Sequence, residues 1–305
     1  MNFTRYEYFD LKYPSSLPQT CIDAMRHLSD RLNDEWFAST FLPAQHFLRT
    51  LLEESKAAAG KAGTNRIVFT FQTSAEYNQS LSLYEMNAED DEPFTIEPAN
   101  GWFDPRVHPR QLYINFDYYE KPARTENLLF ILCFSTAVHE LQHCLMYHSS
   151  GTSPTSPFVS LYDDEDDKTE SGDYIEEKLF GGRVGVGYST DEFKVEALYL
   201  MYVNEDHKEE DGWMGSPYIT NLEALIIGQI THPLSSLAPL NASKFDASVG
   251  VGLSKGKLIG HPDDKASKRR HRVMSRPEQI APQKARFRRD KPRSKSKKKV
   301  TPDPV

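Results

Sequence analysis

The sequence predicts an α+β fold in which a small mixed sheet packs on one long, buried helix. Apolar residues run in helical register through residues 125–147, the strongest periodic segment of the 305-residue chain. Segments rich in β-branched and aromatic side chains at 67–71 and 112–119 predict two strands. Because a sheet must bury one face against another layer, we expect it to pack on the 125–147 helix, with helices supplying the remainder.

Two helices are predicted before the sheet. Residues 20–37 place apolar side chains at helical spacing, and residues 43–54 do the same after Pro43, a residue that suits the first turn of a helix. These helices define an N-terminal helical part, which we place at residues 1–60.

The predicted strands follow a polar break after residue 60. Residues 67–71 have the composition of a buried strand, and residues 112–119 alternate apolar with polar side chains, which predicts one buried face. Residues 93–109, which lie between the two strands, are predicted to be a loop.

Shorter elements are predicted after the long helix. Residues 149–167 have the composition of a surface loop, and residues 169–180 predict a helix that ends at two glycines. Residues 193–203 predict a buried strand or helix, and residues 221–230 a last apolar helix. We therefore place a central domain at residues 61–235.

A glycine-dense stretch at residues 181–187 is predicted to be a turn or hairpin. It lacks the Lys-Ser/Thr pair of a phosphate-binding loop and the strand-to-helix setting of a dinucleotide site. The acidic run at 163–167 lacks the spaced ligands and glycine of a calcium-binding loop, so we expect it to be solvated.

Charge is distributed unevenly along the chain. The net charge is -8, yet residues 255–305 hold 18 Lys and Arg against 5 Asp and Glu, whereas residues 1–254 hold 18 against 39. Residues 236–305 are predicted to be a disordered basic tail. Such a tail suits contact with an import receptor or nonspecific contact with nucleic acid; the alternative is a solvated end that folds back on the acidic body.

Features of the sequence favour an intracellular protein, with the nucleus as a destination that the basic tail suggests. Residues 1–10 lack the basic start and apolar run of a secretory signal. Cys21, Cys133 and Cys144 are a small, odd set for a disulfide scaffold. The longest apolar stretch, 128–138, is too short to span a bilayer, so no membrane association is expected.

The motif His-Glu-Leu-Gln-His lies inside the predicted long helix. His139 and His143 are four residues apart and project from one helical face, which suits two ligands of a tetrahedral zinc ion. Glu140 can reach a water activated by zinc and accept its proton as the water attacks a carbonyl. The motif predicts zinc as cofactor and Glu140 as general base; two ordinary helical histidines are the alternative interpretation.

A catalytic zinc site needs a third protein ligand. The metzincin pattern requires Gly at position 146 and His at position 149, but the chain has Met146 and Ser149, and His148 lies too close along the same helix. We therefore expect an acidic ligand from the helix that follows, where residues 170–177 offer several carboxylates.

Two blocks of the sequence resemble a group of uncharacterised fungal zincin-like proteins of the gluzincin type. One block is the His-Glu-Leu-Gln-His helix; in the other, a Glu-Ser-Gly step at 170–172 precedes an acidic helix ending in Leu-Phe-Gly-Gly. The resemblance covers roughly residues 125–230 and implies a zincin-like fold with Glu170 as third zinc ligand. The small residues Ser171 and Gly172 would let this helix approach the metal helix closely. Glu176 is the main alternative ligand; weaker candidates are Glu177 and Asp173.

The resemblance implies a zinc-dependent metallopeptidase that hydrolyses peptide bonds in a peptide or protein. By analogy with zincins, strand 112–119 would lie at the sheet edge and bind an extended substrate. Tyr188 and His207 are candidates to stabilise the oxyanion. The alternative is a catalytically silent, zincin-derived binding protein that acts through its tail on a nuclear or nucleic-acid partner. An intact Glu140 favours the enzyme.

Overall fold

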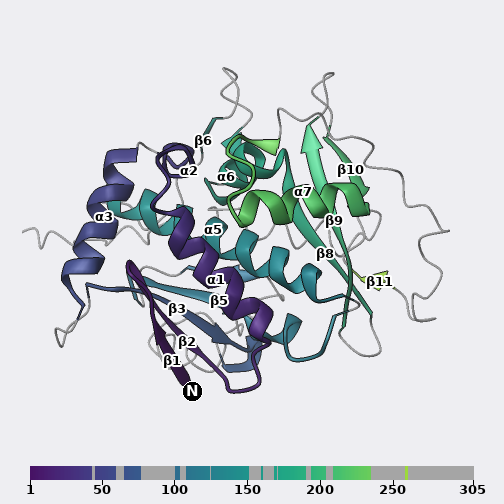
Figure 1. Cartoon of the computed structure of the whole chain (residues 1–305), viewed down its shortest axis with the longest axis horizontal. Coiled ribbons are helices and arrows are strands. Elements are labelled where there is room, and N and C mark those ends of the chain that lie inside the picture. Colours follow the sequence, from purple (N-terminus) through teal and green to yellow (C-terminus); the bar gives the residue numbers. More distant parts are fainter. Residues whose placement is uncertain are drawn as a thin grey trace, which may run out of the picture.

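The long helix α5 (Glu126–Ser150) runs through the middle of the protein and contacts both of its larger sheets (Figure 1). The computed structural model describes residues 1–42, 45–59, 65–76, 100–103, 108–123, 125–150, 159–160, 168–169, 171–189, 194–203, 209–234 and 258–259. The protein has the α+β class that the sequence predicts, and its first sheet is small and mixed.

The first sheet has five strands in the order β1-β2-β3-β5-β4. They are β1 (Asn2–Arg5), β2 (Phe9–Tyr13), β3 (Ile67–Gln72), β5 (Gln111–Asn115) and β4 (Gly101–Trp102). The three inner strands are parallel, and the outer strands β1 and β4 pair antiparallel with their neighbours. The strand predicted at 67–71 is therefore confirmed as β3, the centre of the sheet.

The strand predicted at 112–119 is shorter and more buried than expected. β5 ends at Asn115, whose side chain accepts a hydrogen bond from the backbone N–H of Asp117 (3.0 Å) and starts the 3-10 turn η1 (Phe116–Tyr118). Residues 112–115 are all buried, because β3 and β4 flank the strand and α5 contacts it. The prediction that only one face of this strand is buried was wrong.

The first helical prediction, at 20–37, combined two helices. α1 (Gln19–Arg31) and α2 (Glu35–Ser39) are separated by a turn, in which the side chain of Arg49 donates to the carbonyl of Leu32 (2.8 Å). α3 (Gln45–Ala57) corresponds to the helix predicted at 43–54, although Pro43 lies outside the described residues. An arginine from α3 thus helps to end α1 by satisfying a terminal carbonyl.

Residues 1–60 do not form the separate helical part that the sequence predicts. They supply β1 and β2, and β2 pairs directly with β3 across the expected boundary. Buried Arg66 binds the carboxylate of Asp10 (2.7 Å) and donates to the carbonyl of Ser55 (2.9 Å). A boundary near residue 60 therefore falls within one shared core, which extends from Tyr8 to Leu234.

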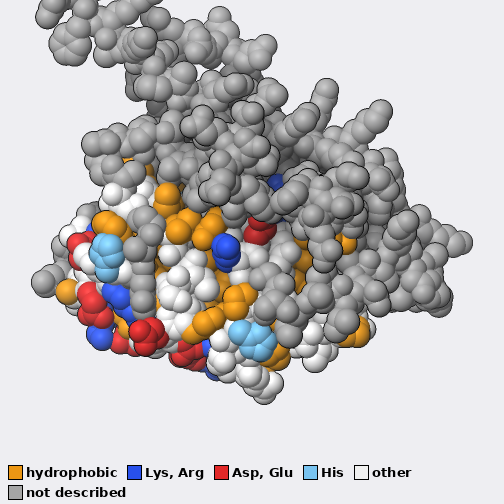
Figure 2. Space-filling model, turned by 90° about the horizontal axis from the view of Figure 1, so that it is seen from above, with side chains coloured by type: hydrophobic (Ala, Val, Ile, Leu, Met, Phe, Trp, Pro, Cys, Tyr) orange, Lys and Arg blue, Asp and Glu red, His pale blue; other side chains and the backbone are white. Residues whose placement is uncertain are grey.

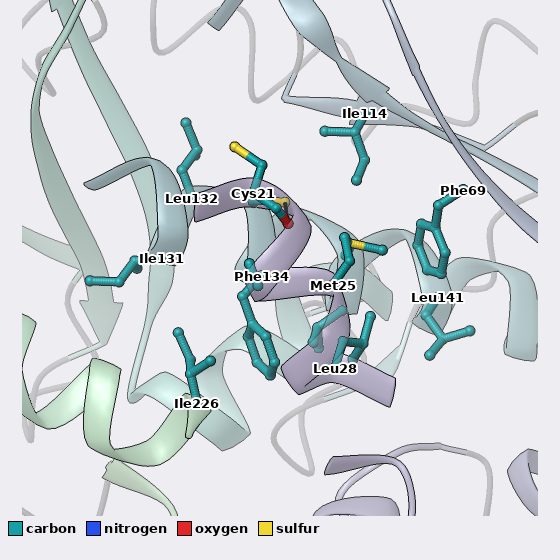
Figure 3. Packing of buried hydrophobic residues seen from close by; sticks show 14 of the residues in the cluster. Cys21, Met25, Leu28, Phe69, Ile114, Ile131, Leu132, Phe134, Leu141 and Ile226 are labelled. Atoms are coloured by element: carbon teal, nitrogen blue, oxygen red, sulfur yellow. Dashed lines mark hydrogen bonds between the residues drawn. The ribbon is translucent and has the colours of Figure 1, made fainter. Parts of the chain in front are cut away.

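α5 is the element on which that core is built. It packs against α1, α3, α6 (Ser171–Phe180) and α7 (Ser216–Ile226). Figure 3 shows side chains of α1, α5, α7 and the first sheet converging in this core. Among the described residues, α5 is long and apolar enough to cross a membrane by length and composition, but 94% of its apolar window is buried within the protein. Protein contacts thus already cover its apolar faces.

The second sheet is antiparallel, in the order β10-β9-β8-β11. Its strands are β10 (Glu209–Trp213), β9 (Val195–Val203), β8 (Arg183–Ser189) and β11 (Leu258–Ile259). The segment predicted at 193–203 is a strand, and the glycine-dense stretch forms the first strand of a hairpin, as the sequence predicts.

The glycines that end α6 are required by its geometry. Gly181 follows the helix with φ 77°, in the left-handed region, and its N–H donates to the carbonyl of Glu177 (3.0 Å). A Cβ on Gly182 would stand 2.4 Å from the carbonyl oxygen of Met201 in β9. The pair therefore turns the chain directly from α6 into the β8–β9 hairpin.

The remaining predictions agree with the structure only in part. α7 begins five residues before the predicted helix at 221–230, with Pro217 in its first turn. The short strands β6 (Val159–Ser160) and β7 (Lys168–Thr169) pair with each other. The acidic run 163–167 and, apart from β11, the predicted basic tail lie outside the described residues. On the face drawn in Figure 2, acidic and basic side chains of the described residues lie interspersed, without a patch of one sign.

Candidate metal centre

His139 and His143 stand one turn apart on α5, with their Nε2 atoms facing each other at 3.1 Å. Two nitrogens at tetrahedral positions on zinc, each about 2.0–2.1 Å from the metal, stand about 3.3 Å apart. The two rings lie edge to face, with their centroids 4.8 Å apart. The predicted ligand pair therefore converges at nearly the spacing that one zinc ion requires.

The outer nitrogen of His139 is held by Glu176. Nδ1 lies 2.9 Å from Oε1 of Glu176, and because an ionised carboxylate only accepts hydrogen bonds, Nδ1 is the donor. Oε2 of the same carboxylate accepts from the backbone N–H of Val184 at 2.6 Å. Glu176, at 6% exposure, therefore joins α5 to the start of β8 and leaves the lone pair of His139 on Nε2.

The position of Glu176 beside Nδ1 of His139 affects the choice among the candidate third ligands. Glu176 lies at Nδ1, whereas the nitrogen that faces His143 is Nε2, so its position suits orienting a ligand more than binding metal. Asp173 instead pairs with Arg183 (3.3 Å). Glu170 lies outside the described residues, and within the described ranges no group of three or more His, Cys, Asp or Glu is arranged to hold a metal ion.

The first residues of α6 pack directly on both histidines. The hydroxyl of Ser171 lies 2.9 Å from Nδ1 of His143, and the residue is fully buried. A Cβ at Gly172 would stand 2.3 Å from Nε2 of His139, closer than real Cβ contacts come. The close approach predicted from these two small residues is confirmed. The hydrogen bond between Ser171 and His143 could not be foreseen, because serine at a helix start ordinarily indicates only a cap.

Glu140 lies beneath β4 and is 3% exposed. A Cβ at Gly101 would stand 2.8 Å from Oε1 of Glu140 and equally close to the side chain of Thr136 and the carbonyl of Tyr113. The backbone of β4 therefore passes directly over the predicted general base. β4 fell within the predicted loop at 93–109, because a two-residue strand leaves no periodic signal.

The predicted substrate strand is not at the sheet edge. β4 pairs antiparallel with β5, at Gly101 with Ile114 and Trp102 with Tyr113, so β5 is an inner strand. Among the described strands, β4 forms the edge of the sheet beside Glu140. The prediction that strand 112–119 lies at the sheet edge was therefore wrong, because β4 lies one strand further out.

Gln142, inside the motif, has a structural role that the sequence did not reveal. Its fully buried amide accepts from the backbone N–H of Leu42 and donates to the carbonyl of the same residue, both at 3.1 Å. These two hydrogen bonds hold the chain after α2 against α5, in the way that one β-strand holds the next.

Other titratable groups near the end of α5 point elsewhere. His148 donates through Nε2 to the carbonyl of Pro109 at 2.7 Å. Burial raises the pKa of the Cys144 thiol to about 12, which disfavours the thiolate that metals bind. The side chain of Tyr188 and all of His207, the predicted oxyanion partners, lie outside what the structure describes.

Comparisons with protein-family models, with curated proteins and with solved structures found no match to this chain. The resemblance to fungal zincin-like proteins therefore stays a prediction. The function has to be inferred from the α+β fold and from the geometry of the histidine pair.

Proposed function

We propose that the protein is a zinc-dependent metallopeptidase of the zincin type, in which His139 and His143 bind the metal and Glu140 is the general base. The observation that carries this proposal is the 3.1 Å separation of the two Nε2 atoms, with both outer nitrogens held by α6. A histidine that binds zinc through one ring nitrogen usually donates from the other to an oriented acceptor.

The donor set fits zinc chemically. Glu176 accepts from Nδ1 of His139, so the Nε2 lone pair of that ring points toward His143. If Ser171 accepts from Nδ1 of His143 in the same way, the Nε2 lone pairs of both rings would be available to hold a cation. Imidazole nitrogens are ligands that zinc favours.

Glu170 remains our proposed third ligand. It immediately precedes Ser171 in the sequence, and the Ser171 hydroxyl is 2.9 Å from Nδ1 of His143. The proposal is supported by this sequence position, because the described neighbour Ser171 contacts one of the two histidines. When bound, zinc supplies a Lewis acid that makes a water more acidic, toward a pKa of ~7, and polarises a carbonyl.

Glu140 would carry the protons of the reaction. Its carboxylate takes a proton from the attacking water, whose oxygen forms a bond to the peptide carbonyl carbon. It then gives that proton to the amide nitrogen as the C–N bond breaks, so that a carboxylate and an amine leave. The enclosure of Glu140 under Gly101 supports this role, since it keeps the carboxylate in one place.

The position of β4 suggests how a substrate is aligned. An extended peptide can add to the edge of a sheet through backbone hydrogen bonds. β4 is the described edge strand closest to Glu140, so a peptide along it would bring its carbonyls toward the base.

Zinc content and turnover together test this function. The full chain should bind about one zinc, and the double variant His139→Ala, His143→Ala should lose it. Glu140→Gln should keep the metal while peptide cleavage falls at least roughly 100-fold. His46→Ala, at an exposed position on α3, is the control and should change neither. Full zinc in the double variant would refute the site.

A catalytically silent binding protein is the second candidate, and the 3% exposure of Glu140 is what favours it. In that case the wild type would hold zinc but cleave no peptide library under metal-replete conditions. We propose that residues 255–305 then serve an import receptor or nucleic acid, through their 18 Lys and Arg. Deleting them should abolish salt-sensitive binding to heparin.

A further inference from the structure

Two aromatic rings meet beyond the histidines, between β4 and α5. The rings of Phe103 and Tyr147 lie edge to face, with their centroids 5.9 Å apart. Phe103 directly follows β4, and Tyr147 lies four residues after His143 on α5. The pair therefore joins the helix that carries Glu140 to the end of the strand that covers it.

Helical geometry places Tyr147 on the face of α5 that carries the candidate site. At about 100° per residue, positions 136, 140, 143 and 147 fall within an arc of about 60° around the helix, and position 147 lies between 140 and 143. Four residues advance the helix by about 6 Å, which is the axial distance from His143 to Tyr147. Tyr147 therefore continues the row of site residues along α5.

The strand side of the pair follows the same direction. Gly101 lies over Thr136 and Glu140, which are among the nearest neighbours of a Cβ at that position. Phe103, two residues later, contacts Tyr147. β4 thus runs toward the C-terminal end of α5, and residues 101 and 103 face the helix together, because successive side chains of an extended chain alternate between its two faces.

The backbone of β4 indicates where a substrate chain would lie. Asn115 donates its N–H to the carbonyl of Asn100 at 2.9 Å, so residues 100 and 115 form a hydrogen-bonded pair of the antiparallel ladder. The next pair, Gly101 with Ile114, is then of the alternate kind, whose N–H and C=O groups point away from the partner strand. The polar groups of Gly101 therefore face the outer edge of β4, next to Glu140.

We propose that Phe103 and Tyr147 determine specificity, by contacting a large apolar side chain of the substrate within two residues of the scissile bond. The inference rests on the proposed peptidase function and names the peptides that this function would favour. Two residues of an extended peptide span about 6.6–6.8 Å, close to the axial distance of about 6 Å between His143 and Tyr147. A substrate carbonyl near Glu140 would thus bring a neighbouring side chain to the two rings.

The protein already holds both rings in place. Phe103 packs against the hydrophobic core, and both side chains are half-buried. The ring of Tyr147 also lies edge-on to His148, at 5.3 Å between centroids, and His148 donates to the carbonyl of Pro109. Little freedom is therefore lost when a third ring packs against them. A substrate Asp or Glu would instead lose water against two apolar surfaces.

Cleavage of paired peptides by the full, zinc-loaded chain tests this selection. The two blocked peptides are identical except for Phe or Ala, which is placed in turn at each position within two residues of the scissile bond. At one position, kcat/KM should be at least about 10-fold higher for the Phe peptide, as expected from burial of its ring. Phe103→Ala and Tyr147→Ala should each nearly abolish this preference.

The ratio of the two rates separates selection from a structural role. If the pair only held β4 on α5, both alanine variants would lower kcat/KM equally for the two peptides, and an unchanged ratio would overturn the inference. Tyr147→Phe keeps the ring and should keep the preference. Phe3→Ala, at an exposed ring on β1 at the opposite edge of the same sheet, is the control and should change neither rate.

Binding distinguishes failure of this inference from failure of the proposed function. Calorimetry of both peptides with Glu140→Gln needs no turnover, and the Phe peptide should bind at least about 10-fold tighter, a difference that adding Phe103→Ala removes. This result without cleavage by the wild type would refute the peptidase and leave the aromatic contact standing. Cleavage without any preference would refute the contact and leave the peptidase standing. Equal binding without cleavage would refute both.

Discussion

The imidazole of His139 lies against the backbone of Gly172, so closely that a Cβ at residue 172 would stand 2.3 Å from Nε2 and 2.4 Å from Cδ2. The contact joins the start of α6 to the centre of α5. The position of the first predicted metal ligand therefore depends on the absence of a side chain on another helix.

Gly172→Ala should displace α6 or the histidine ring. We expect the free energy of unfolding to fall by about 1–3 kcal/mol, as for other overpacked buried sites, and zinc retention to weaken. Urea denaturation and metal analysis measure the two effects. Gly215→Ala is a matched control, since its nearest neighbour would lie at an ordinary 3.8 Å. Equal losses in both variants would contradict the special role of residue 172.

The close approach of α6 to α5 at Gly172 was predicted from the two small residues there, whereas other features of the fold and the site were not. The helix at 125–147 and its motif could be predicted, because a long apolar run and a four-residue histidine spacing are local signals. β1, β2 and β4 were missed, since short strands gain their stability from neighbours that are distant in sequence.

The partners of the histidines depend on tertiary packing for the same reason. Glu176 was considered as a metal ligand because carboxylates on a following helix are chemically suitable. Which ring nitrogen it meets depends on how α6 crosses α5, and the sequence does not encode that crossing locally. The hydrogen bond between Glu176 and Val184 and the one between Ser171 and His143 depend on the same crossing of the two helices.

Glu176→Ala should weaken zinc binding by about 10–100-fold, because His139 loses the acceptor that orients its ring. The buried N–H of Val184 also loses its partner, at a cost of about 1–3 kcal/mol in stability. Competition with a chelator measures the affinity. Glu177→Ala, one residue along and less buried, is the control and should have little effect.

Glu170→Ala should strip the metal more completely than Glu176→Ala, because it removes a proposed ligand rather than an orienting group. Zinc content after dialysis, with circular dichroism to verify folding, gives the comparison. If Glu176→Ala loses zinc and Glu170→Ala retains it, the assignment is wrong by six residues, and Glu176 is the ligand.

The stability of the protein should fall in mild acid through His148. Burial lowers the pKa of His148 from its ordinary value of 6.5, and the charge of Arg110 adds to this, while the hydrogen bond to Pro109 and the charge of Glu54 oppose it. Because the folded pKa is depressed, the unfolded chain takes up the proton first as pH falls. The stabilisation is complete above the ordinary pKa and is lost as pH drops toward the lowered value.

Urea denaturation at about pH 8 and about pH 5 measures this effect. His148→Gln should reduce the loss of stability between the two conditions relative to wild type. A residual loss is expected, since burial also lowers the pKa of His27. An unchanged pH dependence in His148→Gln would show that His148 does not contribute.

Gly101→Ala should test the enclosure of the general base from the side of the first sheet. A Cβ at residue 101 would stand 2.8 Å from Oε1 of Glu140, from Cγ2 of Thr136 and from the carbonyl oxygen of Tyr113. Two of these neighbours are the side chains of α5, and the third is the backbone of β5, so the added methyl has no flexible group to push aside except the carboxylate. Turnover should therefore fall at least roughly 10-fold, since misplacing a catalytic group by about 1 Å is costly. Zinc content should stay near that of wild type, because neither histidine is among these three nearest neighbours of a Cβ at residue 101. Loss of zinc together with activity would instead mean that the first sheet supports the whole site rather than Glu140 alone.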